Sequence, residues 1–216
     1  MEVRLPNDEQ RHAIVGATGS GKTQAALWHL SHRNFHQMPW LIYNFKRDES
    51  IDAIPGATPI ELDEVPEGPG VYIAHPLPHE QEQVENQLWN VWYRGETGVY
   101  VDEGYMLGNR NDAFRALLTQ GRSKRIPMIV LSQRPVQMDR FVFSESDFHQ
   151  VFRLNDRRDR KIAGEFVPID LERKLAPYHS YYYDVGADKS AIMAPVPDIR
   201  TIHSTFARRF ARRRAV

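Results

Sequence analysis

The chain has 216 residues, of which 41% are hydrophobic and 26% charged, a balance that is ordinary for one soluble globular domain. It contains no cysteine, which excludes disulfides and thiolate metal sites. No apolar run reaches the roughly 18–20 residues of a membrane-spanning helix, and the N-terminal sequence MEVRLPNDEQ is too polar for a signal peptide. We therefore expect neither a signal peptide nor a transmembrane segment.

Charge is distributed unevenly along the chain, although the formal net charge is zero. Residues 1–149 carry 14 basic and 20 acidic side chains, whereas residues 150–216 carry 14 basic and 8 acidic. The final stretch, STFARRFARRRAV, places five arginines around Phe206 and Phe210. Such a pattern suits contact with phosphates, and a frayed tail in solvent is the alternative interpretation. We expect a main domain at residues 1–198 and an arginine-rich C-terminal segment at 199–216.

Predicted strands and helices alternate along the chain. The apolar run RHAIV, residues 11–15, predicts a buried strand, and the segment after Lys22 predicts a helix. The later predicted elements are, in order, strand 39–45, a Pro- and Gly-rich connection 54–70, strand 71–75, helix 79–94, strand 98–105, helix 112–122, strand 126–135, strand 148–154, basic helix 156–166 and a strand pair at 180–185 and 190–195. This order predicts an α/β fold with a mostly parallel central sheet, helices on both faces, and ligands beyond the C-terminal ends of the strands.

The stretch GATGSGKT fits the pattern G-x-x-x-x-G-K-[ST] between a predicted strand and a predicted helix. Its glycines permit backbone conformations in which successive N–H groups face phosphate oxygens. Lys22 is expected to contact the β- and γ-phosphates, and the hydroxyl of Thr23 is expected to hold Mg²⁺. The predicted cofactors are ATP and Mg²⁺. The predicted nucleotide-binding residues are Gly16, Ala17, Thr18, Gly19, Ser20, Gly21, Lys22 and Thr23.

Two carboxylates in the sequence VYVDE follow a strand that we expect to lie next to the P-loop strand. Asp102 is the expected ligand of Mg²⁺, and Glu103 is expected to orient and deprotonate the attacking water. A nucleotide or metabolite kinase has less need of the second acid, because its substrate supplies the nucleophile. The pair therefore favours hydrolysis.

Two further residue types are expected to complete the site. Gln133, at the end of the next predicted strand, can contact both the γ-phosphate and the water as a sensor of hydrolysis. Because no small-substrate pocket is evident, we expect mechanical work, and in ring ATPases an arginine of the neighbouring subunit neutralises transition-state charge. Arg122 is our main candidate for that arginine, and the other candidates are Arg125, Arg157 and Arg158.

Taken in order, GATGSGKT, VYVDEGY, GRSKRIPMIVLSQRP and APYHSYYYDV resemble the motifs of the FtsK–HerA superfamily of P-loop motors over roughly residues 10–185. Within it the chain is most similar to the genome-packaging ATPases of tailless, membrane-containing icosahedral viruses and phages. The resemblance implies a RecA/FtsK-like P-loop NTPase fold and an ATP-driven motor that translocates double-stranded DNA through a hexameric or pentameric ring. It assigns the nucleotide, Mg²⁺, water and sensor roles to the residues already named, and it leaves the arginine finger unassigned.

The expected partners are double-stranded DNA, further copies of the chain and a capsid portal vertex or viral membrane proteins, with no small-molecule acceptor. The expected location is the host cytoplasm or the packaging vertex of the virion. Two segments are candidates for a DNA-contacting loop, residues 109–115 and 137–143. Three alternatives remain open: a filamentous-phage assembly ATPase of the zonula-occludens-toxin type, which normally carries a transmembrane helix; a nucleotide or metabolite kinase; and a P-loop scaffold with negligible turnover.

Overall fold

The short apolar runs of the sequence form strands that are buried because helices cover both faces of their sheet. Our computed structural model describes residues 4–107 and 111–213, and within them nine strands form one sheet. The strands are β1 (His12–Val15), β2 (Pro39–Asn44), β3 (Thr58–Pro59), β4 (Gly70–Ala74), β5 (Gly98–Asp102), β6 (Met128–Ser132), β7 (Phe148–Val151), β8 (Ser180–Asp184) and β9 (Lys189–Met193).

The strand order is β3-β4-β2-β5-β6-β1-β7-β8-β9. Every pairing from β3 to β7 is parallel, whereas β8 and β9 add an antiparallel hairpin at one edge. The predicted fold class is confirmed by this mostly parallel sheet with helices on both faces.

The predicted position of the two carboxylates relative to the P-loop strand was wrong. We expected β5 to be the neighbour of β1, but β6 lies between them and pairs with both. In the register, Val15 at the end of β1 lies opposite Ser132 of β6. Because β1, β5 and β6 are all short and buried on both faces, their composition does not distinguish one order from another.

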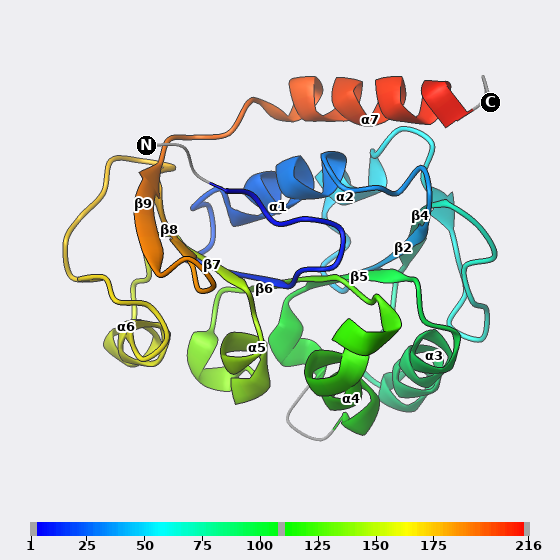
Figure 1. The fold of residues 1–216 in the computed structure, drawn as a ribbon, viewed down its shortest axis with the longest axis horizontal. Coiled ribbons are helices and arrows are strands. Elements are labelled where there is room, and N and C mark those ends of the chain that lie inside the picture. Colours follow the sequence, from blue (N-terminus) through cyan, green and yellow to red (C-terminus); the bar gives the residue numbers. More distant parts are fainter. Residues whose placement is uncertain (1–3, 108–110, 214–216) are drawn as a thin grey trace.

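Helices lie in layers on the two faces of the sheet (Figure 1). On one face α3, α4, α5 and α6 contribute to the apolar core, and on the other face α1, α2 and α7 do so. The α-helices are α1 (Lys22–Ser31), α2 (Glu49–Asp52), α3 (Gln81–Arg94), α4 (Asp112–Gln120), α5 (Arg140–Ser144), α6 (Arg157–Gly164) and α7 (Ile199–Arg213), and the short 3₁₀ helices are η1 (Gly104–Leu107), η2 (Gly121–Lys124) and η3 (Pro135–Gln137). None of the helices within residues 4–107 and 111–213 has the length and apolarity needed to cross a membrane.

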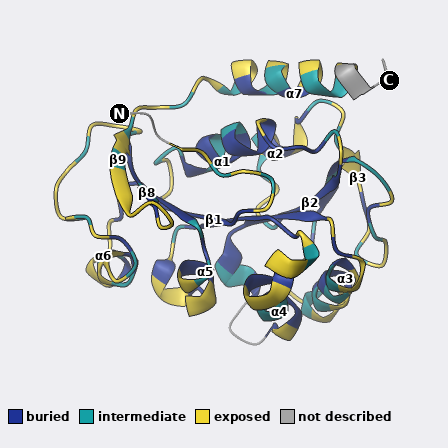
Figure 2. Ribbon diagram, viewed as in Figure 1, coloured by how far each residue is buried: buried dark blue, intermediate teal, exposed yellow. Residues whose placement is uncertain are grey.

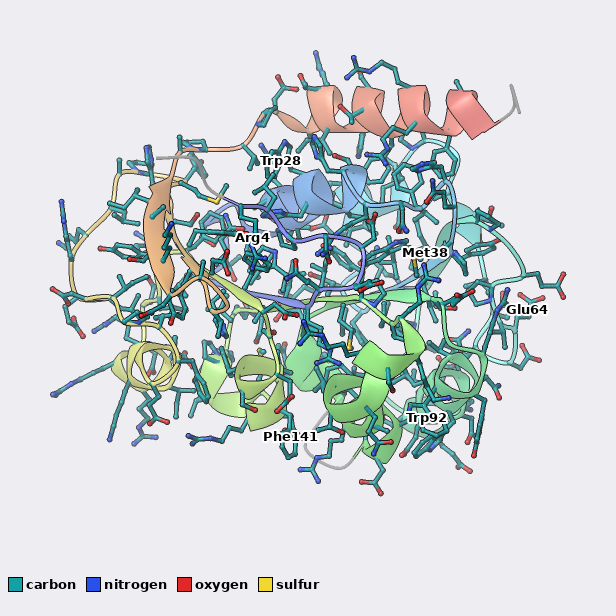
Figure 3. All side chains as sticks on the ribbon, viewed as in Figure 1. Arg4, Trp28, Met38, Glu64, Trp92 and Phe141 are labelled. Carbon is teal, nitrogen blue, oxygen red and sulfur yellow. The ribbon has the colours of Figure 1, made fainter. Side chains whose placement is uncertain are left out.

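The C-terminal segment forms helix α7, which lies over α1 (Figure 1). Ile202 and Phe206 are almost fully buried, and the ring of Phe206 lies 5.2 Å from that of Phe35. Trp28 of α1 belongs to the same apolar cluster and lies in the space between α1 and α7 (Figure 3). A frayed tail is therefore the wrong interpretation for the described part of this segment, because spacings of four residues give its helix one apolar side. The division into a main domain at 1–198 and a separate segment at 199–216 stays a prediction.

Burial falls off toward the outer surfaces of both helical layers (Figure 2). Strands β1, β2 and β5 are buried along their whole length, and they end at the edge of the sheet where the P-loop begins. Glu103, which was predicted as part of a longer strand, instead has a φ of 61° and is followed directly by η1. This turn sends the chain away from the sheet and leaves the side chains of residues 102 and 103 at its C-terminal edge.

Candidate nucleotide-binding and hydrolysis site

The P-loop joins β1 to α1 and takes its shape from three glycines. Gly19 and Gly21 have φ values of 73° and 96°, in the left-handed region that other residues rarely adopt. A Cβ on Gly16 would lie 2.6 Å from the Cβ of Phe152, so this position also requires glycine. The loop conformation therefore depends on the residues that defined the sequence pattern.

Two backbone hydrogen bonds hold the loop against neighbouring strands. The N–H of Gly16 donates to the carbonyl of Ser132 at 3.1 Å, and the N–H of Ala17 donates to that of Arg153 at 2.9 Å. Since Ser132 ends β6 and Arg153 follows β7, the loop is fixed at the C-terminal edge of the sheet.

The first turn of α1 lies immediately after the loop. Gly21 is its N-cap and gives no side-chain hydrogen bond, and the first turn has no acidic residue, so the free N–H groups of this helix end suit an anion. Lys22 is the first residue of the helix, and its ammonium group is buried 3.6 Å from the nearer carboxylate oxygen of Glu103. Thr23 follows it in the same turn.

The two predicted carboxylates come together at the end of β5. Asp102 is 1% exposed and Glu103 is fully buried. Burial, and then the charge of Glu103, raises the pKa of Asp102 to about 7. The Oδ2 atom of Asp102 is buried and has no hydrogen-bond partner. This is an arrangement that a cation would stabilise.

Glu103 is contacted from three sides. Its Oε1 atom pairs with Lys46 as well as with Lys22, and its Oε2 atom accepts a hydrogen bond of 3.2 Å from the backbone N–H of Gln133. Sequence reasoning missed Lys46. The available signal was its position just after a buried strand of a sheet whose ligands lie at the strand ends.

Gln133 connects the P-loop to the carboxylates. Its side-chain oxygen accepts a hydrogen bond from the hydroxyl of Thr18, while its backbone N–H binds Glu103. An open cavity of 230 Å³ lies between Gln133, the P-loop and Asp156 before α6. The predicted sensor is thus in contact with both other parts of the site.

Arg122 lies away from this site within one chain. Its guanidinium is 3.5 Å from Asp147, which directly precedes β7, whereas the P-loop lies at the other end of β7. Arg125 pairs with Glu96 at 2.8 Å in a similar position. Neither arginine can reach the P-loop of its own chain, and the role of Arg122 in a neighbouring site stays a prediction.

A second cavity, which the sequence did not indicate, adjoins the P-loop at Gly21. It has a volume of 210 Å³ and is bounded by Gln24, Phe152, Tyr178 and Pro195. Tyr178 has a φ of 61° and is 60% exposed, and its ring lies 3.3 Å from where a Cβ of Gly21 would be. An aromatic ring therefore lies directly beside the P-loop at Gly21.

Comparison with known proteins gives the family. No protein-family model matches the chain. The chain is 50% identical over 217 residues to the "DNA packaging ATPase P9" of Enterobacteria phage PRD1, and the match covers 95% of this chain and 96% of that protein. The chain belongs to this family of phage DNA-packaging ATPases.

Solved structures agree with the fold of the ATPase. The genome packaging NTPase B204 of Sulfolobus turreted icosahedral virus 2, in complex with AMPPCP, superposes with a TM-score of 0.70 at 18% identity, covering 88% of this chain and all of that one. EssC (ATPases 2 and 3) of Geobacillus thermodenitrificans gives a TM-score of 0.63 at 12% identity, covering 97% of this chain and 45% of that one.

The residues of the ATPase fit a bound nucleotide and metal ion. Two buried side-chain oxygens, Ser20 Oγ in the P-loop and Asp102 Oδ2 at the end of β5, have no hydrogen-bond partner. Leaving such groups unsatisfied is unfavourable, and a phosphate and a hydrated cation supply the missing partners. The cradle made by the glycines and the buried ammonium of Lys22 has the charge and shape that a triphosphate requires.

Proposed function

We propose that the protein uses ATP hydrolysis to drive double-stranded DNA through a ring of identical subunits, and so packages a viral genome into a preformed capsid. The observation that carries the proposal is the contact of Gln133 with both Thr18 and Glu103. This contact joins a nucleotide loop to a buried carboxylate through a residue that can respond to the γ-phosphate. It supports hydrolysis coupled to movement, and membership of the packaging family indicates DNA as what is moved.

In the proposed ATP complex the P-loop N–H groups and Lys22 hold the phosphates. Thr23 and Asp102 are the residues that would hold Mg²⁺, which when bound supplies positive charge against the phosphate oxygens. Charge neutralisation by a cation would also favour the ionised form of Asp102, whose pKa burial raises.

The adenine base is assigned to the 210 Å³ cavity beside Gly21. Tyr178 and Gln24 both line this cavity, and they bring to it an aromatic ring and an amide. The amide of Gln24 now donates to the carbonyl of Pro197 at 2.8 Å. This contact links the cavity to the segment that precedes α7.

Glu103 is the proposed base for the attacking water. Each of its carboxylate oxygens has a partner, namely the two lysines on Oε1 and the N–H of Gln133 on Oε2. A γ-phosphate would draw Lys22 away from Glu103, because the phosphate carries more negative charge. An oxygen of Glu103 then becomes available to accept a proton from water.

The proposed function is tested by measuring phosphate release with and without long double-stranded DNA at two salt concentrations. We expect DNA to stimulate hydrolysis, and the stimulation to weaken as salt rises, because phosphate contacts are electrostatic. Lys22→Ala serves as the blank, and Glu103→Gln is expected to bind ATP normally but turn over roughly 10²–10⁴-fold more slowly. DNA-independent turnover, or transfer of phosphate to a small acceptor, would contradict the proposal.

A further inference from the structure

A basic groove runs along α6, and Asp156 lines both this groove and the cavity beside Gln133. It is an open depression of 950 Å³ between α6 and residues 164–172. It adjoins a cavity of 490 Å³ beside β7, and the groove and this cavity share Arg160, Leu171 and Glu172. Figure 3 shows nitrogen-tipped side chains reaching outward from α6.

Most of the cations around this groove lack acidic partners. Seven basic side chains line it or its neighbouring cavity, and one of them, Arg160, pairs with Glu172. The other six are exposed, and none of them forms an ion pair with any residue in the described part of the chain. They are Arg153, Arg157, Arg158, Lys161, Arg173 and Lys174.

Most acidic residues near the groove are held by other groups. Asp156 caps α6 by accepting from backbone N–H groups, and the almost fully buried Asp159 pairs with Arg134 at 3.1 Å. Glu165 pairs with Arg140, and Glu172 pairs with Arg160. The unpaired cations therefore face solvent with little local compensation.

The two loops that the sequence indicated for DNA contact differ from this groove, because the arginines in their described parts form ion pairs within the chain. Arg115 at the end of one pairs with Asp139 at 2.6 Å, and Arg140 in the other pairs with Glu165 at 3.3 Å. Asn109 and Arg110 lie outside the described residues. In the described parts of both loops the arginines are thus engaged within the chain, whereas those beside α6 are free to contact an external anion.

We propose that the groove along α6 binds the phosphate backbone of double-stranded DNA. This inference rests on the proposed function and assigns a surface to it. Lysines and arginines around an open groove suit phosphates, and phosphate contacts carry no direct sequence information, as a protein that moves any sequence requires. The groove also connects to the site of hydrolysis, since Asp159 of α6 binds both Arg134, next to Gln133, and the backbone N–H of Val136 at 2.9 Å.

The test compares two variants, each lacking three exposed cations. The groove variant is Lys161→Gln with Arg173→Gln and Lys174→Gln, which avoids the arginines considered for the neighbouring site. The control is Lys189→Gln with Arg200→Gln and Arg208→Gln, on β9 and α7, which are exposed. DNA binding by wild-type protein and both variants is measured by fluorescence anisotropy over a range of salt concentrations. Thermal unfolding and DNA-free ATP hydrolysis confirm that each variant is intact.

We expect the groove variant to bind DNA at least about tenfold more weakly at low salt, with a salt slope reduced by about 2–3 because each lost phosphate contact removes roughly 0.9. The control variant should bind like the wild type. An unchanged affinity and slope for an intact groove variant, or a loss confined to the control variant, would overturn the inference while leaving the proposed function standing. If wild-type protein hydrolyses ATP and does not bind DNA at any salt concentration, the proposed function itself fails.

Discussion

Among single residues, the ion pair between Lys46 and Glu103 is expected to have the clearest effect on the free energy of unfolding. Glu103 is fully buried, whereas the side chain of Lys46 is 39% exposed and reaches inward to it. Removing Lys46 would leave the buried carboxylate with only Lys22 and the N–H of Gln133 as partners, and losing one partner of a buried charge costs more than the pair itself contributes.

Lys46→Met is expected to lower the free energy of unfolding of the nucleotide-free protein by about 1–3 kcal/mol. On a Glu103→Gln background the same substitution should cost much less, because the buried charge is no longer present. Urea unfolding of the four proteins in this cycle measures the coupling, with Lys189→Met as the exposed control. Equal costs on both backgrounds would show that the two side chains do not interact.

The P-loop could be predicted from the sequence, whereas for Lys46 the sequence indicates only a place near a strand end and not its partner. Much of the loop geometry depends on residues adjacent in the sequence, because Gly19 and Gly21 adopt left-handed conformations that other residues rarely adopt. The contact of Lys46 is with a residue 57 positions away, and no local pattern specifies it. Residue spacing also did not indicate the cavity beside Gly21, since Tyr178 reaches it from a loop that is distant in the sequence.

At the scale of elements, three buried histidines lie where β1, α1 and β7 meet the hairpin. Burial lowers the pKa of His29 to about 3 and that of His149 to about 4, and it lowers the pKa of His12 well below its ordinary value. In the unfolded chain each titrates near 6.5. Between these values the unfolded state binds more protons, so stability is present above about pH 6.5 and is lost as the pH falls.

The three histidines should therefore decrease the free energy of unfolding between pH 7 and pH 5, by up to about 1.4 kcal/mol per pH unit for each histidine below pH 6.5, and the raised pKa of Asp102 offsets only one of these contributions. His149 stacks on Phe143, with ring centroids 6.3 Å apart, and a phenyl ring can take its place. His149→Phe should make the pH dependence shallower when measured by urea unfolding. A slope unchanged from wild type would exclude this histidine as a source of the dependence.

The docking of helix α7 is expected to contribute to stability. Phe206 is fully buried against Phe35, so Phe206→Ala should lower the free energy of unfolding by about 3–5 kcal/mol. Arg208→Ala, on an exposed position two residues later, should change it by no more than about 0.5 kcal/mol. Denaturant unfolding of the two variants tests this difference, and equally small effects would mean that α7 does not dock in solution.

Element type was easier to predict from the sequence than element position. Strands buried on both faces and the helix over residues 81–94 follow from local apolar patterns. The insertion of β6 between β5 and β1 depends on tertiary packing, which those patterns do not contain. The arginines of the last segment drew attention to charge, whereas Ile202, Phe206 and their spacing decide how it packs.

Across the whole molecule, Arg122 and the P-loop lie at opposite ends of the strands, Arg122 at the N-terminal ends and the P-loop at the C-terminal ends. If Arg122 completes a neighbouring site, each subunit of a ring presents its two edges to different neighbours. Mixing Arg122→Ala subunits with Lys22→Ala subunits should then restore part of the hydrolysis at interfaces that combine an intact loop with an intact arginine. Phosphate release measured over a series of mixing ratios tests this, and a lack of rescue at every ratio would exclude Arg122 from the role.

In the proposed function hydrolysis moves DNA through the ring, and displacement of a third strand from duplex DNA measures this movement directly. Wild-type protein is incubated with linear double-stranded DNA that carries a labelled triplex-forming strand, in the presence of ATP or of a non-hydrolysable analogue. We predict that the third strand is released with ATP, and that it stays bound with the analogue or with the Lys22→Ala variant. If DNA stimulates hydrolysis while the third strand remains in place, the protein is a DNA-dependent ATPase but does not translocate DNA, which would contradict the account.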